Sequence, residues 1–252
     1  MIEVRNLYKS FGTLQVLKDV SLKVNEGETM VVMGKSGIGK SVLLKQIIGI
    51  NKPDQGQIFV NEIETTNLYG EALYEANKDL GMLFQGGALF DSMSVFENVI
   101  FHESFHKNTP TESLREVAQR ALEQVDLKDV LDKVPAELSG GMKKRVALAR
   151  LIAYRPKMIL YDEPTTGLDP ITAQVIIDLI IKVNKELNAT SIVVTHDLVL
   201  AIAVASKIAL IDQGEVHIIE DPKAFFSHTD NDIINFFKKI MPHQCLTERF
   251  GS

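Results

Sequence analysis

Cysteine is almost absent: Cys245 stands alone among the 252 residues of the chain. A disulfide within the chain needs two cysteines, so the sequence excludes this kind of internal cross-link. A chain with a single cysteine also suits a reducing compartment, and we expect it to work in the cytoplasm.

Long hydrophobic runs are missing as well. The longest nearly apolar run covers residues 198–211, and a serine and a lysine interrupt it. It is shorter than the ~20 apolar residues that span a bilayer. The opening stretch MIEVRNLYKSFG carries Glu3 and Arg5 and has no continuous apolar core, unlike a secretory signal. We therefore expect that the chain does not cross a membrane by itself.

The sequence has no basic excess and no repeats. Its net charge is −6 at pH 7, and its isoelectric point is about 5.6. Such a chain offers no broad basic surface to a phosphate backbone, which argues against sequence-independent binding to nucleic acid. With 45% hydrophobic residues it can bury one core, or one core with an inserted lobe, but hardly two independent domains.

Strand and helix patterns alternate along the chain. Alternating or wholly apolar runs predict strands over residues 2–7, 19–24, 29–34, 56–61, 79–85, 157–163 and 190–196, and a hairpin over 207–219. Helical apolar spacing predicts helices over 41–50, 94–106, 111–127, 138–150, 171–187, from about 198, and over 231–240. The pattern indicates an α/β core interrupted by helices between about 86 and 156.

The run GKSGIGKS has the pattern and the context of a phosphate-binding (Walker A) loop, because it follows a predicted strand and opens a predicted helix. The backbone N–H groups of Gly37, Ile38 and Gly39 can wrap a β-phosphate, since glycine permits close approach and a helix N-terminus favours negative charge. Lys40 would bridge the β- and γ-phosphates, and the Ser41 hydroxyl would ligate Mg²⁺. A plain glycine turn is the weaker alternative.

The run MILYDE leads an apolar strand to two adjacent carboxylates, Asp162 and Glu163. Side chains alternate along a strand, so the two acids cannot do the same job. Asp162 would hold Mg²⁺ through water, and Glu163 would orient and deprotonate the attacking water. Two acids at a strand end are often solvated turn residues, but the phosphate-binding loop elsewhere in the chain favours the catalytic interpretation.

The run LSGGMKKRVALAR predicts a second anion site. Ser139 is a good N-cap, and Gly140 and Gly141 leave the first N–H groups of the predicted helix uncovered. One ATP needs only one phosphate loop from its own chain. The spare site therefore implies a second nucleotide surface that faces another copy of the chain.

The order of these motifs resembles the ATPase subunits of ABC transporters. The order is phosphate loop, Gln85, LSGG, LYDE, GLD and His196, and the resemblance covers about residues 1–230. It implies a P-loop NTPase of the ABC-ATPase fold, with a RecA-like core, an antiparallel β subdomain and an inserted α-helical subdomain at about 86–156. Residues 231–252 would form a C-terminal helix and tail.

The same resemblance implies ATP hydrolysis coupled to transport, with ATP and Mg²⁺ bound. Two copies would sandwich two ATP molecules head to tail, so that Ser139 and Gly141 contact the γ-phosphate held by the partner's Lys40. Phe11 would stack on adenine, which needs only a flat π-face. Asp169, in TGLD, would lie in the loop that crosses the dimer beside Glu163.

The resemblance gives the remaining residues their roles. Gln85 would reach Mg²⁺ and the attacking water and sense the membrane partner, and His196 would contact the γ-phosphate. The predicted nucleotide-binding residues are Phe11, Gly34, Ser36, Gly37, Ile38, Gly39, Lys40, Ser41, Val42, Ser139, Gly140, Gly141 and Asp169. The predicted catalytic residues are Glu163, His196 and Gln85, and the predicted Mg²⁺ ligands are Ser41, Gln85 and Asp162.

Met142 departs from the family pattern, which usually has glutamine there. A thioether accepts hydrogen bonds poorly, so any polar contact of this side chain to ribose should be lost. The backbone donors and Ser139 would still hold the phosphate. Two interpretations stay open: Met142 packs across the dimer, or it fills an apolar helix stripe.

The stretch QGGALFDSMSVFENV indicates the branch of the family. Ala88, Leu89 and Phe90 place apolar groups just after Gln85, where the family receives a coupling helix from its membrane subunit. Together with LSGGM, this stretch resembles the ATP-binding subunits of the Mla-type (MCE-associated) phospholipid transport systems.

That branch implies a set of partners and a location. The partners are an MlaE-like integral-membrane permease and an MCE-domain protein, and a STAS-domain (MlaB-like) subunit is left open. The chain would be peripheral, on the cytoplasmic face of the inner membrane. Two rival functions remain: the motor of another ABC solute importer or exporter, and a soluble ABC-type scaffold ATPase.

Overall fold

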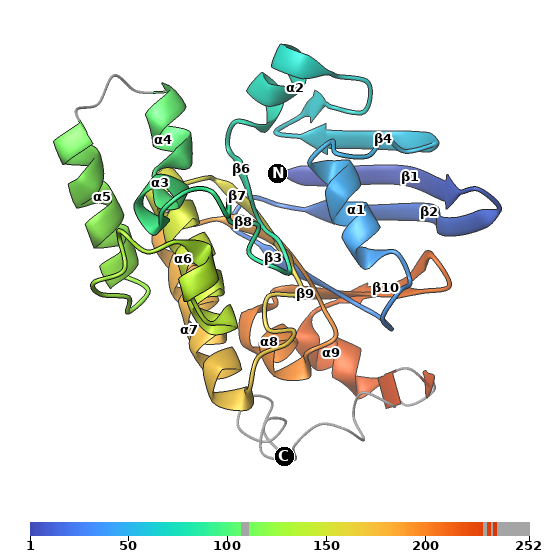
Figure 1. Cartoon of the computed structure of the whole chain (residues 1–252). Helices are drawn as coiled ribbons and strands as arrows, with labels where there is room; N and C mark the ends of the chain where they lie inside the picture. The colour runs from blue at the N-terminus through green and yellow to red at the C-terminus, as the bar shows by residue number, and fades with distance from the viewer. Residues whose placement is uncertain (107–110, 229–230, 233, 236–252) are drawn as a thin grey trace. The chain divides into compact units, whose positions relative to one another are not determined.

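The computed structural model describes residues 1–106, 111–228, 231–232 and 234–235 (Figure 1). The chain divides into two compact units: unit 1 contains the described residues of 1–78 and 190–252, and unit 2 contains those of 79–189. The predicted C-terminal helix over 231–240 and the tail with Cys245 lie, apart from those four positions, outside the described residues.

Unit 1 begins with an antiparallel sheet of four strands in the order β2-β1-β4-β5. The strands are β1 (Ile2–Phe11), β2 (Leu14–Val24), β4 (Gln55–Val60) and β5 (Ile63–Glu64). The β1–β2 hairpin is longer than predicted because Gly12, at φ 59°, turns the chain tightly and lets Phe11 pair with Leu14.

The second sheet of unit 1 is mainly parallel and carries the phosphate-binding loop. In it β3 (Thr29–Met33) lies between β8 (Thr190–Thr195) and β9 (Lys207–Asp212) and runs parallel to both, while β10 (Glu215–Glu220) pairs antiparallel to β9. Every residue of β3 and β8 is buried, as expected for parallel strands covered on both faces. The helices of the unit within residues 1–78 and 190–228 are α1 (Lys40–Ile47), α2 (Gly70–Asn77), α8 (Leu198–Val204) and α9 (Pro222–Ser227).

Unit 2 combines a parallel strand pair with a group of helices. The strands β6 (Leu80–Leu83) and β7 (Met158–Asp162) are wholly buried. The helices are α3 (Val95–Val99), α4 (Phe101–His106), α5 (Thr111–Glu123), a 3-10 turn at Pro135–Glu137, α6 (Gly140–Tyr154) and α7 (Pro170–Leu187). Figure 1 shows α3 to α6 gathered together, and α6 packs against α3, α4, α5, α7 and β6.

Some elements differ from the sequence-based expectation. The helix predicted over 94–106 is two helices, because Ile100 leaves helical geometry at φ −92° and ψ 9°. Helices α2 and α9 and strand β5 were not predicted. Within α2 only Ala76 is buried, so this helix has no apolar stripe to read. None of the described helices combines the length and the hydropathy that a membrane-spanning helix needs.

Candidate nucleotide-binding and hydrolysis site

Backbone conformation and close neighbouring atoms explain the glycines of the phosphate-binding loop, which joins β3 to α1 in unit 1. Gly37 and Gly39 have φ values of 83° and 102°, in the region that favours glycine. A Cβ atom at Gly39 would lie 2.6 Å from Cγ1 of Val16, and one at Gly34 would lie 2.3 Å from the backbone oxygen of Ile211. The loop therefore keeps its path only with glycine at these positions.

Lys40 brings a buried ammonium group to this loop. Its side chain is 5% exposed, and Nζ donates hydrogen bonds of 2.8 Å to the backbone oxygens of Gly34 and Lys35. Helix α1 begins at Lys40 without a side-chain cap and without an acid in its first turn. An ammonium group and an uncapped helix N-terminus together fit an anion such as a phosphate. Ser41 and Val42 follow in the first turn, and Ser36 is exposed in the loop.

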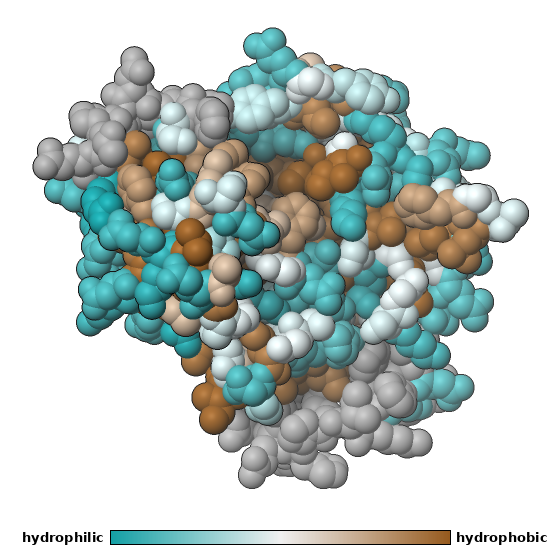
Figure 2. Space-filling view, viewed as in Figure 1, coloured by the Kyte–Doolittle hydropathy of each residue, from teal (hydrophilic) through white to brown (hydrophobic). Residues whose placement is uncertain are grey.

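The predicted adenine-binding ring lies at the end of β1. Phe11 is 48% exposed, and Figure 2 shows hydrophobic surface over the tip of the β1–β2 hairpin. Lys9 places its Nζ 5.4 Å from the ring centroid of Phe11 and is itself held by Asp54 at 2.9 Å. Asp54 also accepts a 2.6 Å bond from the backbone N–H of Ser10. The ring is thus carried on a fixed backbone with part of its surface open, as stacking requires.

His196 is exposed directly after β8 in unit 1. The next residue, Asp197, caps α8 by accepting bonds from the N–H groups of Val199 (2.9 Å) and Leu200 (3.3 Å). The N–H of Asp197 donates to Oγ1 of Thr195 at 3.0 Å. The backbone is therefore fixed on both sides of His196. Sequence reasoning did not assign this role to Asp197, although an acid at the start of a helix is a recognised N-cap.

The two predicted acids lie at the end of β7 in unit 2. Asp162 is the last residue of the strand, Glu163 follows it, and both are buried. Glu163 has a φ of 46°, which is uncommon for a residue with a side chain. Oγ1 of Thr166 donates a 3.0 Å hydrogen bond to Oε2 of Glu163. Thr166 thus orients the carboxylate of the predicted base.

Lys144, on α6, interacts with the predicted base and the loop after it, and it is not among the predicted site residues. Its Nζ donates to the backbone oxygens of Pro164 at 2.6 Å and of Thr166 at 2.7 Å. Burial lowers the pKa of Lys144 to about 8, although the carboxylate of Glu163 acts in the opposite direction. The helix is thereby joined to the loop that carries the predicted base.

Ser139 caps the start of α6, as predicted from the sequence. Oγ of Ser139 accepts a 3.3 Å bond from the N–H of Met142, and the helix begins at Gly140. Gly141 has a further reason to be glycine: an added Cβ would lie 2.6 Å from Cγ2 of Thr172 on α7. The side chain of Met142 is partly exposed. This arrangement leaves both interpretations of Met142 open.

Asp169 caps the N-terminus of α7. Its carboxylate accepts bonds from the N–H groups of Ile171 at 3.1 Å and Thr172 at 3.0 Å. Hydrogen bonds from Thr172, first from its side chain and then from its backbone, lower the pKa of Asp169 below the ordinary value. Because Thr172 also lies against Gly141, the starts of α6 and α7 are in direct contact.

Gln85 is exposed just after β6, at the head of the apolar stretch. Hydrogen bonds fix the backbone that follows it. Arg150, on α6, donates to the backbone oxygens of Gly87 at 2.9 Å and Ala88 at 3.0 Å. Phe90 is 41% exposed, and its ring centroid lies 4.5 Å from that of Phe101.

The buried side chain of Asn98 fixes the next part of this stretch, residues 90–94. It accepts a 2.8 Å bond from the N–H of Phe90 and donates to the backbone oxygens of Phe90, Met93 and Ser94 at 3.0–3.1 Å. The exposed ring of Phe90 is therefore presented by a rigid loop. Neither Asn98 nor Arg150 was predicted to support this surface.

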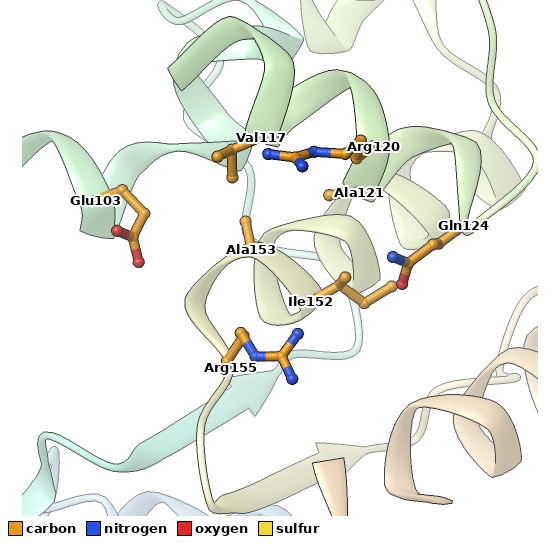
Figure 3. Close-up of a pocket in the computed structure, with 8 residues that line it drawn as sticks. All are labelled: Glu103, Val117, Arg120, Ala121, Gln124, Ile152, Ala153 and Arg155. Carbon is orange, nitrogen blue, oxygen red and sulfur yellow. The ribbon is translucent and has the colours of Figure 1, made fainter. Parts of the chain in front are cut away.

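A separate cavity of about 390 Å³ lies among the helices of unit 2 (Figure 3). One carboxylate, two guanidinium groups, one amide and aliphatic side chains line it. The lining residues are Glu103, Val117, Arg120, Ala121, Gln124, Ile152, Ala153 and Arg155. None of them is a predicted site residue.

Comparisons with known proteins identify the family. A family model described as "ABC transporter" matches residues 17–166. The chain is 40% identical over 238 residues to the intermembrane phospholipid transport system ATP-binding protein MlaF of Haemophilus influenzae, covering 94% of this chain and 90% of that protein. It is 39% identical over 220 residues to the methionine import ATP-binding protein MetN 4 of Oceanobacillus iheyensis, covering 86% and 64%.

A solved structure leads to the same family. It is a dimeric ATP-binding cassette in a post-hydrolysis state, bound to ADP and Pi; it is 34% identical to this chain, with a TM-score of 0.81 over 88% of this chain and 98% of that one. The chain belongs to the ABC transporter family and is an ATPase subunit. The predicted ABC-ATPase fold and the predicted ATPase activity are confirmed.

Proposed function

We propose that the chain is the ATP-driven motor of an ABC transporter that moves phospholipid between membranes. The observation that carries this proposal is the 40% identity to MlaF along 94% of the chain. The motor of another ABC importer is the second candidate, because the identity to MetN 4 is 39%.

ATP would be held first by unit 1. Phe11 would stack on adenine, and the loop from Gly34 to Gly39 would surround the phosphates with backbone N–H groups. Lys40 would bridge the β- and γ-phosphates. The fit rests on the buried ammonium group and on the uncapped start of α1. Mg²⁺, held by Ser41, Gln85 and, through water, Asp162, would neutralise charge on the phosphates.

Hydrolysis would depend on Glu163 as general base. Its buried carboxylate would accept a proton from the attacking water, and the hydroxyl of Thr166 would keep it oriented. His196 would contact the γ-phosphate from the end of β8. This division of roles follows the chemistry of the side chains: one acid for the metal, a second acid for the proton and a ring N–H for the phosphate.

A second copy of the chain would complete each site. Ser139 and Gly141 would contact the γ-phosphate held by the partner's Lys40, and Asp169 would lie in the loop that crosses the dimer. The similarity to the dimeric cassette supports this pairing. Two identical contacts related by a twofold axis follow from such an arrangement.

The membrane partner would dock on the surface at Phe90. An exposed aromatic ring on a loop fixed by Asn98 and Arg150 suits an apolar coupling helix. The chain would therefore lie at the cytoplasmic face of the inner membrane. Its partners would be an MlaE-like permease and an MCE-domain protein, with a STAS-domain (MlaB-like) subunit as a further component.

The test is to isolate the complex from its native membrane, with wild-type chain and with Phe90→Asp. A charge at this position must be desolvated when an apolar helix docks, at a cost of a few kcal/mol. We expect the variant to lose the permease while it keeps its affinity for ATP. Ile181→Asp is the matched control, because Ile181 is 40% exposed in the same unit.

Mass spectrometry of the wild-type complex then identifies the cargo. Bound phospholipid supports the proposal. A permease that carries an amino acid favours the second candidate, and a chain that brings down no permease refutes both. Retention of the permease by Phe90→Asp would show that the partner docks elsewhere.

A further inference from the structure

Unit 2 contains a buried lysine that interacts with the proposed catalytic base. Lys144 is 5% exposed, and lysine is almost never buried unless its ammonium group finds partners. Its two partners are the backbone oxygens of Pro164 and Thr166, which belong to the loop just after Glu163. All of these residues belong to unit 2.

We propose that Lys144 is a positioning residue for ATP hydrolysis: by holding the loop at residues 164–166, it fixes the carboxylate of Glu163. The proposal rests on the role of general base proposed for Glu163. Lys144 itself does not touch the reacting atoms; it acts through the loop.

The backbone at Glu163 needs such support. Its φ of 46° lies in the left-handed region, and a residue with a side chain persists there only when its surroundings hold it. Lys144 supplies two hydrogen bonds to the residues that follow. An apolar side chain in its place would leave two carbonyls without these bonds, which is costly in a buried setting.

Thr166 connects Lys144 to the carboxylate of Glu163 through two hydrogen bonds. The backbone oxygen of Thr166 accepts from Lys144, and its hydroxyl donates to Oε2 of Glu163 at 3.0 Å. The N–H of Thr166 also donates to the backbone oxygen of Glu163 at 3.3 Å. The ammonium group of Lys144 also attracts the carboxylate of Glu163, and this attraction helps the hydrogen bonds to hold the carboxylate in place.

The position of Lys144 on α6 connects its hydrogen bonds to the loop with the proposed dimer surface. The helix begins at Gly140, one turn before Lys144, at the surface proposed to meet the ATP held by the second copy. Glu163 would act on the ATP of its own chain. Lys144 therefore links the surface that meets one nucleotide to the base that acts on the other.

The experiment compares three substitutions in the full-length chain. Lys144→Met keeps the length and the apolar stem but removes the donors, Lys144→Arg keeps donors, and Lys143→Met is the matched control on the same helix. We expect kcat of Lys144→Met to fall roughly 10- to 100-fold, as for a misplaced catalytic group. Its Kd for ATP should stay within about two-fold, because the phosphate-binding loop lies in unit 1. Lys144→Arg should recover most of kcat, and Lys143→Met should stay within about two-fold of wild type.

A second measurement separates positioning from general stability. Thr166→Val removes the hydroxyl that orients Glu163, so its loss of kcat and that of Lys144→Met should be less than additive in the double variant. Fully additive losses would contradict a shared path. If Lys144→Met does not fold, Lys144→Gln takes its place, since its side chain is one atom shorter and uncharged and holds the N–H donors farther from both carbonyl oxygens.

Glu163→Gln, measured in parallel, distinguishes the two proposals. If Glu163→Gln loses hydrolysis while Lys144→Met, or Lys144→Gln in its place, keeps kcat within about two-fold, the positioning role is wrong. If Glu163→Gln keeps hydrolysis, the base has been misassigned. Lost kcat in Lys144→Met, at unchanged ATP affinity and with recovery in Lys144→Arg, supports the inference.

Discussion

Phe11 is a large aromatic residue that the fold leaves about half exposed. It is 48% exposed at the end of a paired strand, with a cation near its ring and a fixed backbone beneath it. A large aromatic side chain held in this way has a face to offer to a ligand. Adenine stacking is the use we propose for it.

We expect Phe11→Ala to weaken nucleotide binding by roughly 1 kcal/mol, about five-fold in Kd, through lost stacking. Binding of other purine nucleotides should fall by a similar factor, because a π-face does not read the base edge. Leu14→Ala is the control, since Leu14 pairs with Phe11 across the hairpin and is more exposed. Titration calorimetry with ATP gives both values; an unchanged Kd for Phe11→Ala would count against its placement under the base.

Some single residues can be predicted from the sequence and others cannot. The glycines of the phosphate loop stand in a motif whose geometry demands them, and the structure gives Gly34 and Gly39 a packing reason. The helical spacing of the sequence does indicate that Lys144 is buried, because it lies on the same helical stripe as Ala147, Leu148 and Leu151, all of which are buried. A charged residue on such a stripe must find buried partners. The identity of those partners depends on a loop distant in sequence.

A cap and a close contact define the start of helix α6, and both come from residues of the LSGG motif. Ser139 provides the cap, and Gly141 lets Thr172 of α7 approach. Met142 takes part in the cap through its backbone N–H only. The side chain at position 142 therefore has little to do with the geometry of the helix start.

We expect Met142→Gln to leave ATP hydrolysis nearly intact, because the groups proposed to contact the γ-phosphate precede it. Ser139→Arg should abolish hydrolysis, since it puts bulk at a close contact and removes a cap worth about 1 kcal/mol. Steady-state ATPase rates check both, and thermal unfolding shows whether Ser139→Arg still folds. Equal losses in the two variants would contradict this division of roles.

At the level of elements, the fully buried strands are the part that the sequence predicts best. Strands β3, β7 and β8 are each buried along their full length, and each contains a run of three or more apolar residues that indicates a buried strand. The prediction of one continuous helix over 94–106 was wrong. Its apolar spacing continues across Ile100, but Asn98 bonds to the backbone of the preceding loop, and the helical path changes after Val99. The apolar periodicity of the sequence gives no indication of these hydrogen bonds of Asn98.

The whole molecule is proposed to work as a pair. Each chain would supply a phosphate loop to one ATP and the start of α6 to the other, so neither copy alone has a complete site. The order of motifs along the sequence is enough to predict this arrangement and the family. The sequence predicts a helical subdomain inserted at about 86–156, but not the bounds of the two units of the described chain, because a unit is defined by contacts between segments distant in sequence.

We expect Glu163→Gln to bind Mg-ATP normally while hydrolysis falls on the order of 10²-fold or more, since the base is lost and little binding surface is changed. ATP should therefore hold the variant as a dimer that ADP does not. Analytical ultracentrifugation with each nucleotide measures this, and the wild type is the control. A variant that stays monomeric with ATP would argue against the sandwich.

Asn98 gives the surface at Phe90 a property of its own. One amide side chain bonds to the backbone of Phe90, Met93 and Ser94, so the loop is ordered when unit 2 folds and not when a partner arrives. A partner that docks on Phe90 meets a preorganised surface and does not have to immobilise it. The affinity of that encounter is then set by the side chains that touch, while the conformational entropy of the loop has already been lost in folding.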